Sequence, residues 1–280
     1  MLQDITSIAW AKMVIFLLSG ALHGFGLYIL NRVRPHPLFN DVQRIYLMHL
    51  SICEMFISIE NSLVEFVLRV TLGKTPDLLN RLMDIGSFTW FIGIMILMTI
   101  DRFFTVYYPL RYPVYWNKRK SQFAVGGLLS MSAIMAVVYT FIPMETQMRL
   151  LVRAYYWFSF LVVFLVVILV TYLFILKKIA QNNSSTSAGS QNNSRFKRSL
   201  LVPTLIMSTF ILLWAVPFLV SFVGIYVKLD IPAKVWQYAI IIFGIGFCLD
   251  AITYIFLQPS LKNEIKKLFF TRASTDISQR

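Results

Sequence analysis

The chain has 280 residues, of which 58% are hydrophobic and only 14% are charged. Soluble domains carry about 25% charged residues, so this composition excludes a water-soluble single domain. The formal net charge of +13 does not indicate nucleic-acid binding, because the basic residues lie between long apolar runs and form no continuous basic patch. Cys53 and Cys248 both lie inside apolar runs, which provides neither a disulfide framework nor a metal-ligand pattern.

Several apolar runs are long enough to cross a membrane. A helix needs about 20 predominantly apolar residues to cross a bilayer core, because each residue rises about 1.5 Å. In chain order the runs that meet this requirement are Ile8–Arg32, Arg44–Val70, Leu78–Tyr108, Ser121–Ile142, Tyr155–Leu176, Ser199–Val227 and Val235–Leu257. The second run is the most polar, because it contains Glu54, Glu60 and Glu65. We therefore predict an all-α membrane protein with a seven-transmembrane helix bundle in residues 1–258.

The loops between these runs differ in their content of Lys and Arg, which cytoplasmic loops retain. One side of the predicted bundle holds eighteen of these residues and the opposite side holds five. This asymmetry places the amino terminus outside the cell and the carboxyl terminus inside, in a multi-pass protein of the plasma membrane. The first run is long enough to span and no positive stretch precedes it, so we expect an anchoring helix instead of a cleaved signal peptide.

Two segments on the predicted cytoplasmic side do not span the membrane. Residues 178–197 include the low-complexity string QNNSSTSAGSQNNS, which is typical of a flexible loop. Residues 259–280 contain LKNEIKKLFF, in which apolar residues recur at helical spacing among lysines: Leu261, Ile265, Leu268 and Phe269. This pattern predicts a short amphipathic surface helix that contacts membrane lipid, with an ordinary solvated tail as the alternative.

The inner end of the third run carries a specific motif. It reads Asp101-Arg102-Phe103-Phe104-Thr105-Val106-Tyr107-Tyr108-Pro109-Leu110-Arg111-Tyr112. This string closely resembles the rhodopsin-like (class A) G-protein-coupled receptors, in which Asp-Arg-Tyr is followed after a short apolar stretch by Pro-Leu-x-Tyr. Weaker resemblances to motifs of that family occur on the second, fifth, sixth and seventh runs, at Leu50–Glu54, Tyr172–Ile175, Trp214–Pro217 and Asp250–Tyr254.

The chain also departs from that family at several positions. The third run lacks an outer Cys and the fourth lacks a Trp, while Phe164 in the fifth run and Ala251 in the seventh occupy places where the family has Pro. A short connection near Met144–Leu151 is a further difference. The missing outer Cys, the missing Pro of the fifth run, this short connection and the Asp-type motif at Asp250–Tyr254 are together similar to the melanocortin and adenosine-like branches.

The resemblance implies an activation switch at the inner end of the bundle. It makes Asp101 the restraint on Arg102, and Arg102 the contact for a G protein once helix six moves outward. A guanidinium at a membrane boundary is costly unless it is paired, so an ion pair that only fixes the helix end is the alternative. The other switch residues that the resemblance implies are Tyr172, Pro217, Asp250 and Tyr254. For the two tyrosines, an ordinary position in the interfacial aromatic belt competes with this role.

A candidate ligand site lies nearer the outer side. Asp84 precedes Arg102 by eighteen residues, or about 27 Å of helix. The resemblance places it where amine receptors hold the ammonium group of their ligand, and a carboxylate among aromatic rings suits a cation. The aromatic residues that could line this cavity are Trp90, Trp157, Phe158, Trp214, Phe218 and Trp236. Arg81 lies three residues before Asp84, so a structural ion pair competes with ligand binding.

Glu54 and Asp250 form a predicted intramembrane carboxylate pair. Both are expected at a similar central depth, where two carboxylates cannot comfortably ionise together, so they either share a proton or bind a cation. The helix-three sodium ligand of the family would fall at Phe91, which has no side-chain oxygen, so we favour the shared proton and assign no metal. The alternative is that the two acids are satisfied separately by groups such as Thr253, His49 or His23.

These patterns together predict a receptor that binds an extracellular small molecule or peptide in the outer half of the bundle and activates a heterotrimeric G protein. We predict no cofactor and no enzymatic activity, because the sequence contains no catalytic constellation. An opsin-like photoreceptor would need a lysine in the seventh run, which has none. A transporter or channel is supported only by the intramembrane carboxylates and lacks internal repeats.

Overall fold

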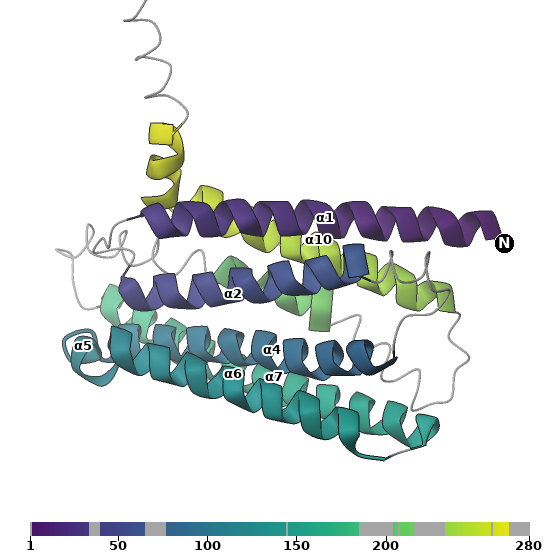
Figure 1. Cartoon of the computed structure of the whole chain (residues 1–280). Helices are drawn as coiled ribbons and strands as arrows, with labels where there is room; N and C mark the ends of the chain where they lie inside the picture. Colours follow the sequence, from purple (N-terminus) through teal and green to yellow (C-terminus); the bar gives the residue numbers. More distant parts are fainter. Residues whose placement is uncertain are drawn as a thin grey trace, which may run out of the picture.

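The computed structural model describes residues 2–33, 40–64, 77–143, 145–184, 204–206, 208–215, 233–258 and 260–268. Every regular element within these ranges is helical, and the long helices run side by side in one bundle (Figure 1). The elements are α1 (Leu2–Arg32), α2 (Asp41–Ile59), a π-helical turn η1 (Glu60–Val64), α4 (Asp77–Tyr107), α5 (Tyr112–Tyr115), α6 (Lys118–Phe141), α7 (Thr146–Ser184), η2 (Ile211–Ala215) and α10 (Ala233–Leu257). Residues 260–268 form a further short helix.

Five of the described helices are long and apolar enough to cross a membrane. They cover Ile8–Arg32, Ile85–Tyr107, Lys118–Phe141, Leu151–Lys178 and Tyr238–Leu257. Many apolar side chains of α6 and α7 point outward, including Ile134, Val163, Val166 and Leu169. An apolar outer surface of this extent suits hydrocarbon and not water. The predicted all-α membrane bundle is therefore confirmed as a helical membrane bundle.

The second predicted run differs from the other runs in its packing. Helix α2 and η1 cover 41–64, and residues 65–70 of that run lie outside the described residues. Helix α2 is not among the helices that are apolar enough to cross a membrane. It nevertheless packs between α1 and α4 and buries Glu54 completely. Its polar residues are therefore directed into the bundle. Of the sixth run, 204–206 and 208–215 are helical.

Helix α7 extends beyond both predicted ends of the fifth run, Tyr155 and Leu176. No Gly or Pro occurs between Thr146 and Ser184, so nothing in the sequence interrupts the helix. Residues 178–184, which we expected in the flexible loop, are helical, whereas 185–197 lie outside the described residues.

An aromatic cluster fills the centre of the bundle. Trp214 stacks on Phe243 and Phe91 at centroid distances of 4.4 and 5.0 Å, and Phe91 contacts Phe247 edge-on at 5.7 Å. Aromatic pairs of this kind contribute about 0.5–1.5 kcal/mol each beyond their burial. The cluster joins α4, η2 and α10, and its Phe247 also borders the second polar site described below.

Candidate functional site

The first polar site lies where α4 ends. Helix α4 stops at Tyr107 because Pro109 disfavours a helical conformation in the residue before it. The chain then turns through α5, and this turn is held against the bundle by Trp116. The Trp116 ring stacks on Phe104 at a centroid distance of 6.1 Å, and its Nε1 donates a hydrogen bond of 2.7 Å to the hydroxyl of Tyr46. The turn is thereby fixed to α4 and α2.

Asp101 and Arg102 are both buried at this end of the bundle, with exposed fractions of 0% and 4%. The Tyr112 hydroxyl donates a 2.5 Å hydrogen bond to Oδ1 of Asp101, and Nη2 of Arg102 lies 3.5 Å from Oδ2. Burial, together with the charge of the Asp101 carboxylate and the hydrogen bond to it, raises the pKa of Tyr112. Tyr112 therefore remains a hydrogen-bond donor to this carboxylate at neutral pH.

Gln43 completes the surroundings of the guanidinium. The side-chain amide of Gln43 is assigned so that its oxygen, and not its nitrogen, faces Arg102. In this orientation the oxygen accepts hydrogen bonds from Nη1 and Nη2 of Arg102 at 2.7 and 2.8 Å. The backbone N–H of Gln43 donates to Oδ1 of Asn40, the N-cap of α2, at 2.8 Å. Asn40 in turn donates to the Tyr112 hydroxyl at 3.3 Å. We call Asn40, Gln43, Asp101, Arg102 and Tyr112 the Arg102 site.

Tyr172 lies beside this site on α7. Its hydroxyl is 3.2 Å from the hydroxyl of Thr204, and it lies within electrostatic range of Arg102. Sequence reasoning did not assign a role to Gln43, Asn40 or Tyr112. The N-cap pattern Asn40-Asp41 and the position of Tyr112 in the helix-three string were the only signals that could have pointed to them.

The second polar site lies among α1, α2 and α10. Nε2 of His23 is 2.6 Å from Oε2 of Glu54 and 3.0 Å from the carbonyl oxygen of Phe247, and both side chains are completely buried. Because a carbonyl oxygen can only accept, Nε2 carries the hydrogen that is directed at Phe247. Among the described residues, neither oxygen of Glu54 has an aligned hydrogen-bond partner. The contact with His23 is therefore a close electrostatic one.

Asp250 and Tyr254 contribute to this second site from α10. Asp250 is 3% exposed and lies close enough to Glu54 for their charges to interact. The Tyr254 hydroxyl accepts a 2.8 Å hydrogen bond from Ser51 and lies 3.4 Å from Nδ1 of His23. We call His23, Ser51, Glu54, Asp250 and Tyr254 the Glu54 site. In this structure Tyr254 contacts this site and not Arg102.

Gly26 explains how Tyr254 reaches α1. A Cβ atom at Gly26 would overlap the Tyr254 hydroxyl and ring. Only glycine leaves room for this close approach. Tyr254 of α10 thus packs directly over the backbone of α1 at Gly26.

Comparison with known protein families gives one match. Residues 29–254, most of the chain, match the family described as 7 transmembrane receptor (rhodopsin family). The chain belongs to this family. It is therefore a receptor-type, multi-pass membrane protein, and the matched range includes the whole Arg102 site, while His23 precedes it. No curated protein matches the chain.

The predicted ligand-binding residues of this rhodopsin-family receptor are only partly described. Trp157 and Trp214 both contact Phe88, at centroid distances of 5.1 and 6.3 Å, so the structure brings these two tryptophans together. Trp90 instead packs edge-on against His49 at 6.2 Å, and Phe158 is half-buried on α7. The side chains of Asp84 and Trp236 lie outside the described part of the structure, as do residues Pro217 and Phe218.

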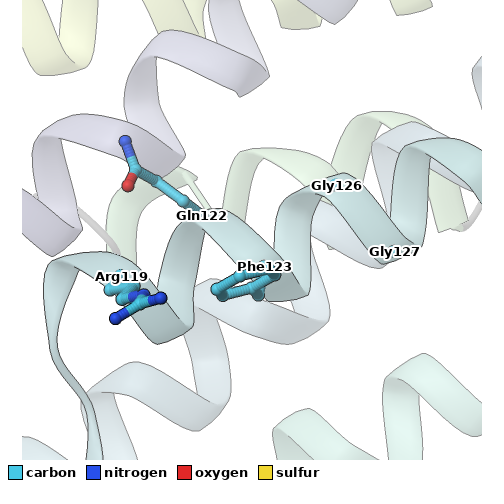
Figure 2. Close-up of a pocket in the computed structure, with 5 residues that line it drawn as sticks. All are labelled: Arg119, Gln122, Phe123, Gly126 and Gly127. Atoms are coloured by element: carbon cyan, nitrogen blue, oxygen red, sulfur yellow. The ribbon is translucent and has the colours of Figure 1, made fainter.

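A hollow of about 400 Å³ lies on the outer face of α6 (Figure 2). It is lined by Arg119, Gln122, Phe123, Gly126 and Gly127. The Arg119 guanidinium lies 5.9 Å from the centre of the Phe123 ring, and a Cβ atom at either glycine would meet no atom within 4 Å. None of the predicted ligand-binding residues lines this hollow, so it is separate from the predicted ligand cavity.

Proposed function

We propose that this receptor binds an extracellular ligand and activates a heterotrimeric G protein through Arg102. The observation that carries the proposal is the burial of Arg102 within a hydrogen-bonded site at the end of α4. A permanent charge at this position is costly to desolvate, so a site that only stabilised the helix end would gain little from it. Its use as a contact that becomes accessible in a second packing of the bundle accounts for its presence.

The proposed orientation has seven spans, the amino terminus outside the cell and the Arg102 site on the cytoplasmic side of the plasma membrane. The division of eighteen basic residues against five supports it. The helix at 260–268 is proposed to lie on the inner leaflet. Its Leu261 is buried and its Ile265 and Leu268 pack against the core, while Lys262, Lys266 and Lys267 are exposed toward anionic headgroups.

The proposed ligand is a small molecule or peptide that enters the outer half of the bundle. The ring of Trp157 already faces the guanidinium of Arg153 at 5.1 Å from its centroid, so a cationic group of the ligand would bind elsewhere or displace Arg153. If the ligand is cationic and Asp84 binds it, Asp84→Asn lowers agonist potency. Unchanged potency would instead indicate that Asp84 serves a structural pair with Arg81.

The proposal is tested by topology and coupling together. An epitope tag at Met1 should be stained on intact cells, and a tag after Arg280 only after permeabilisation. Arg102→Ala should abolish signalling in a panel of G-protein dissociation sensors while surface staining stays near that of the unmodified receptor. Normal signalling by Arg102→Ala, or the reverse staining pattern, would refute the proposed function.

A further inference from the structure

The Arg102 guanidinium has an acceptor that the helix-three motif does not include. Gln43 receives hydrogen bonds from both Nη atoms at 2.7 and 2.8 Å, whereas the nearest carboxylate oxygen, Oδ2 of Asp101, lies 3.5 Å from Nη2. Gln43 is 7% exposed. One acceptor at hydrogen-bond distance from this buried charge is therefore a neutral amide on α2.

Gln43 belongs to a ring of hydrogen bonds that one ion pair closes. Its backbone N–H donates to Asn40, Asn40 donates to Tyr112, Tyr112 donates to Asp101, and Asp101 contacts Arg102, which returns to Gln43. The ring joins the first turn of α2, the turn at α5 and the last part of α4. Because Asn40 is the N-cap of α2, the position of Gln43 is set by the helix start and not by a mobile loop.

The sequence after α7 gives a reason for such an acceptor. The segment Arg195-Phe196-Lys197-Arg198, which precedes the sixth run, is basic and contains no carboxylate that could pair with Arg102. Besides Asp101 on α4, Arg102 has an acceptor on another helix. The first turn of α2 supplies it, and it does so with a hydrogen-bond acceptor that carries no charge.

We propose that Gln43 is the latch that holds Arg102 in the signalling-silent packing, so that release of Arg102 requires separation at the α2–α4 contact. This inference rests on the proposed role of Arg102 in coupling. Hydrogen bonds to a charged group are stronger than neutral ones, so loss of the latch shifts the equilibrium between the silent and active packings by about tenfold. Gln43 acts through Arg102 and is a positioning residue.

The test measures basal G-protein dissociation per receptor at the cell surface, without any ligand. Gln43→Met keeps the length of the side chain and removes its acceptor, and it should raise basal signalling several-fold up to about tenfold. Gln43→Glu keeps an acceptor and adds a charge, and its basal signal should be equal to or below that of the unmodified receptor. Gln122→Met on the exposed face of α6 is the matched control and should change nothing.

A second comparison tests whether the rise requires Arg102. In the double variant Gln43→Met with Arg102→Ala, the rise should disappear, because the released group is absent. If Gln43→Met does not reach the surface, Gln43→Asn carries the same test, since its amide is one methylene too short to reach Arg102.

The outcomes also distinguish the latch from the proposed function. If Arg102→Ala abolishes signalling but Gln43→Met leaves the basal signal unchanged, the latch is overturned and the coupling role stands. An equal rise in Gln43→Met and Gln43→Glu would overturn the latch as well. If Arg102→Ala signals normally, the coupling role itself fails.

Discussion

Replacement of His23 by Leu should destabilise the receptor through Glu54. The two side chains are completely buried and their nearest atoms are 2.6 Å apart. The variant loses a short contact between two completely buried polar groups, and a buried polar group left without its partner costs about 1–3 kcal/mol. His23→Leu leaves Glu54 beside Asp250 without its imidazole neighbour, so we expect a loss of about 1–3 kcal/mol.

Replacement of both partners should cost much less than this. In the double variant His23→Leu with Glu54→Leu no buried carboxylate remains unpaired at that position, and apolar replacements of buried pairs are often neutral. We therefore expect a coupling free energy of about 1–3 kcal/mol between the two positions. The free energy of unfolding of detergent-solubilised receptor, measured by titration with a denaturing detergent, provides the four values of the cycle.

His49→Leu is the control for loss of an imidazole. His49 is half-buried on α2 and packs against Trp90, so its replacement should change the free energy of unfolding by about 1 kcal/mol or less. The reasoning fails if His23→Leu costs no more than His49→Leu, or if the double variant is as unstable as the sum of the single variants. Either result would mean that His23 and Glu54 lie side by side but that neither side chain stabilises the other.

Three further predictions concern the two polar sites. Glu54→Gln and Asp250→Asn should be non-additive in basal signalling, which should depend little on sodium; additive effects would place the two acids in independent surroundings. Gly26→Ala should lower the free energy of unfolding by about 1–3 kcal/mol because its methyl group overlaps Tyr254, whereas Gly126→Ala, where the space is open, should be tolerated. Tyr112→Phe removes the donor to Asp101 and should cost about 1.5–3 kcal/mol in the same assay; an unchanged value would show that Asp101 finds another donor.

Local sequence patterns predicted the helices and the motif at the end of α4, because these depend on neighbouring residues. The apolar runs predicted helices that the structure describes, and the helix-three string identified Asp101 and Arg102. The same string included Tyr112, but the hydrogen bond across the turn depends on how the chain reverses after Pro109. The turn brings the phenol back under α4, and no periodicity encodes that.

Contacts between distant helices were less accessible to sequence reasoning. Gln43 and Arg102 lie on separate helices, and their contact depends on the rotation of α2 against α4. The sequence offered three groups as partners for the buried acids: Thr253, His49 and His23. Only the packing of α1 on α2 shows that His23 lies beside Glu54, whereas His49 packs against Trp90. The π-helical turn η1 was not predicted either, although Asn61 and Ser62 there donate to the carbonyl oxygens of Ile57 and Ser58, which compete with regular helix bonds.

Helix α2 connects the two polar sites, and this connection gives a reason for its low hydropathy. Gln43 and Glu54 are eleven residues apart, three helical turns or about 16 Å, so they lie on nearly the same face of α2. Ser51, on that side of the helix, bonds Tyr254 of α10. A change at Glu54 that rotates or shifts α2 therefore moves Gln43 relative to Arg102, because a helix transmits such motion as a rigid element. The polar residues that lower the hydropathy of α2 thus place Glu54 beside Asp250 and Gln43 beside Arg102.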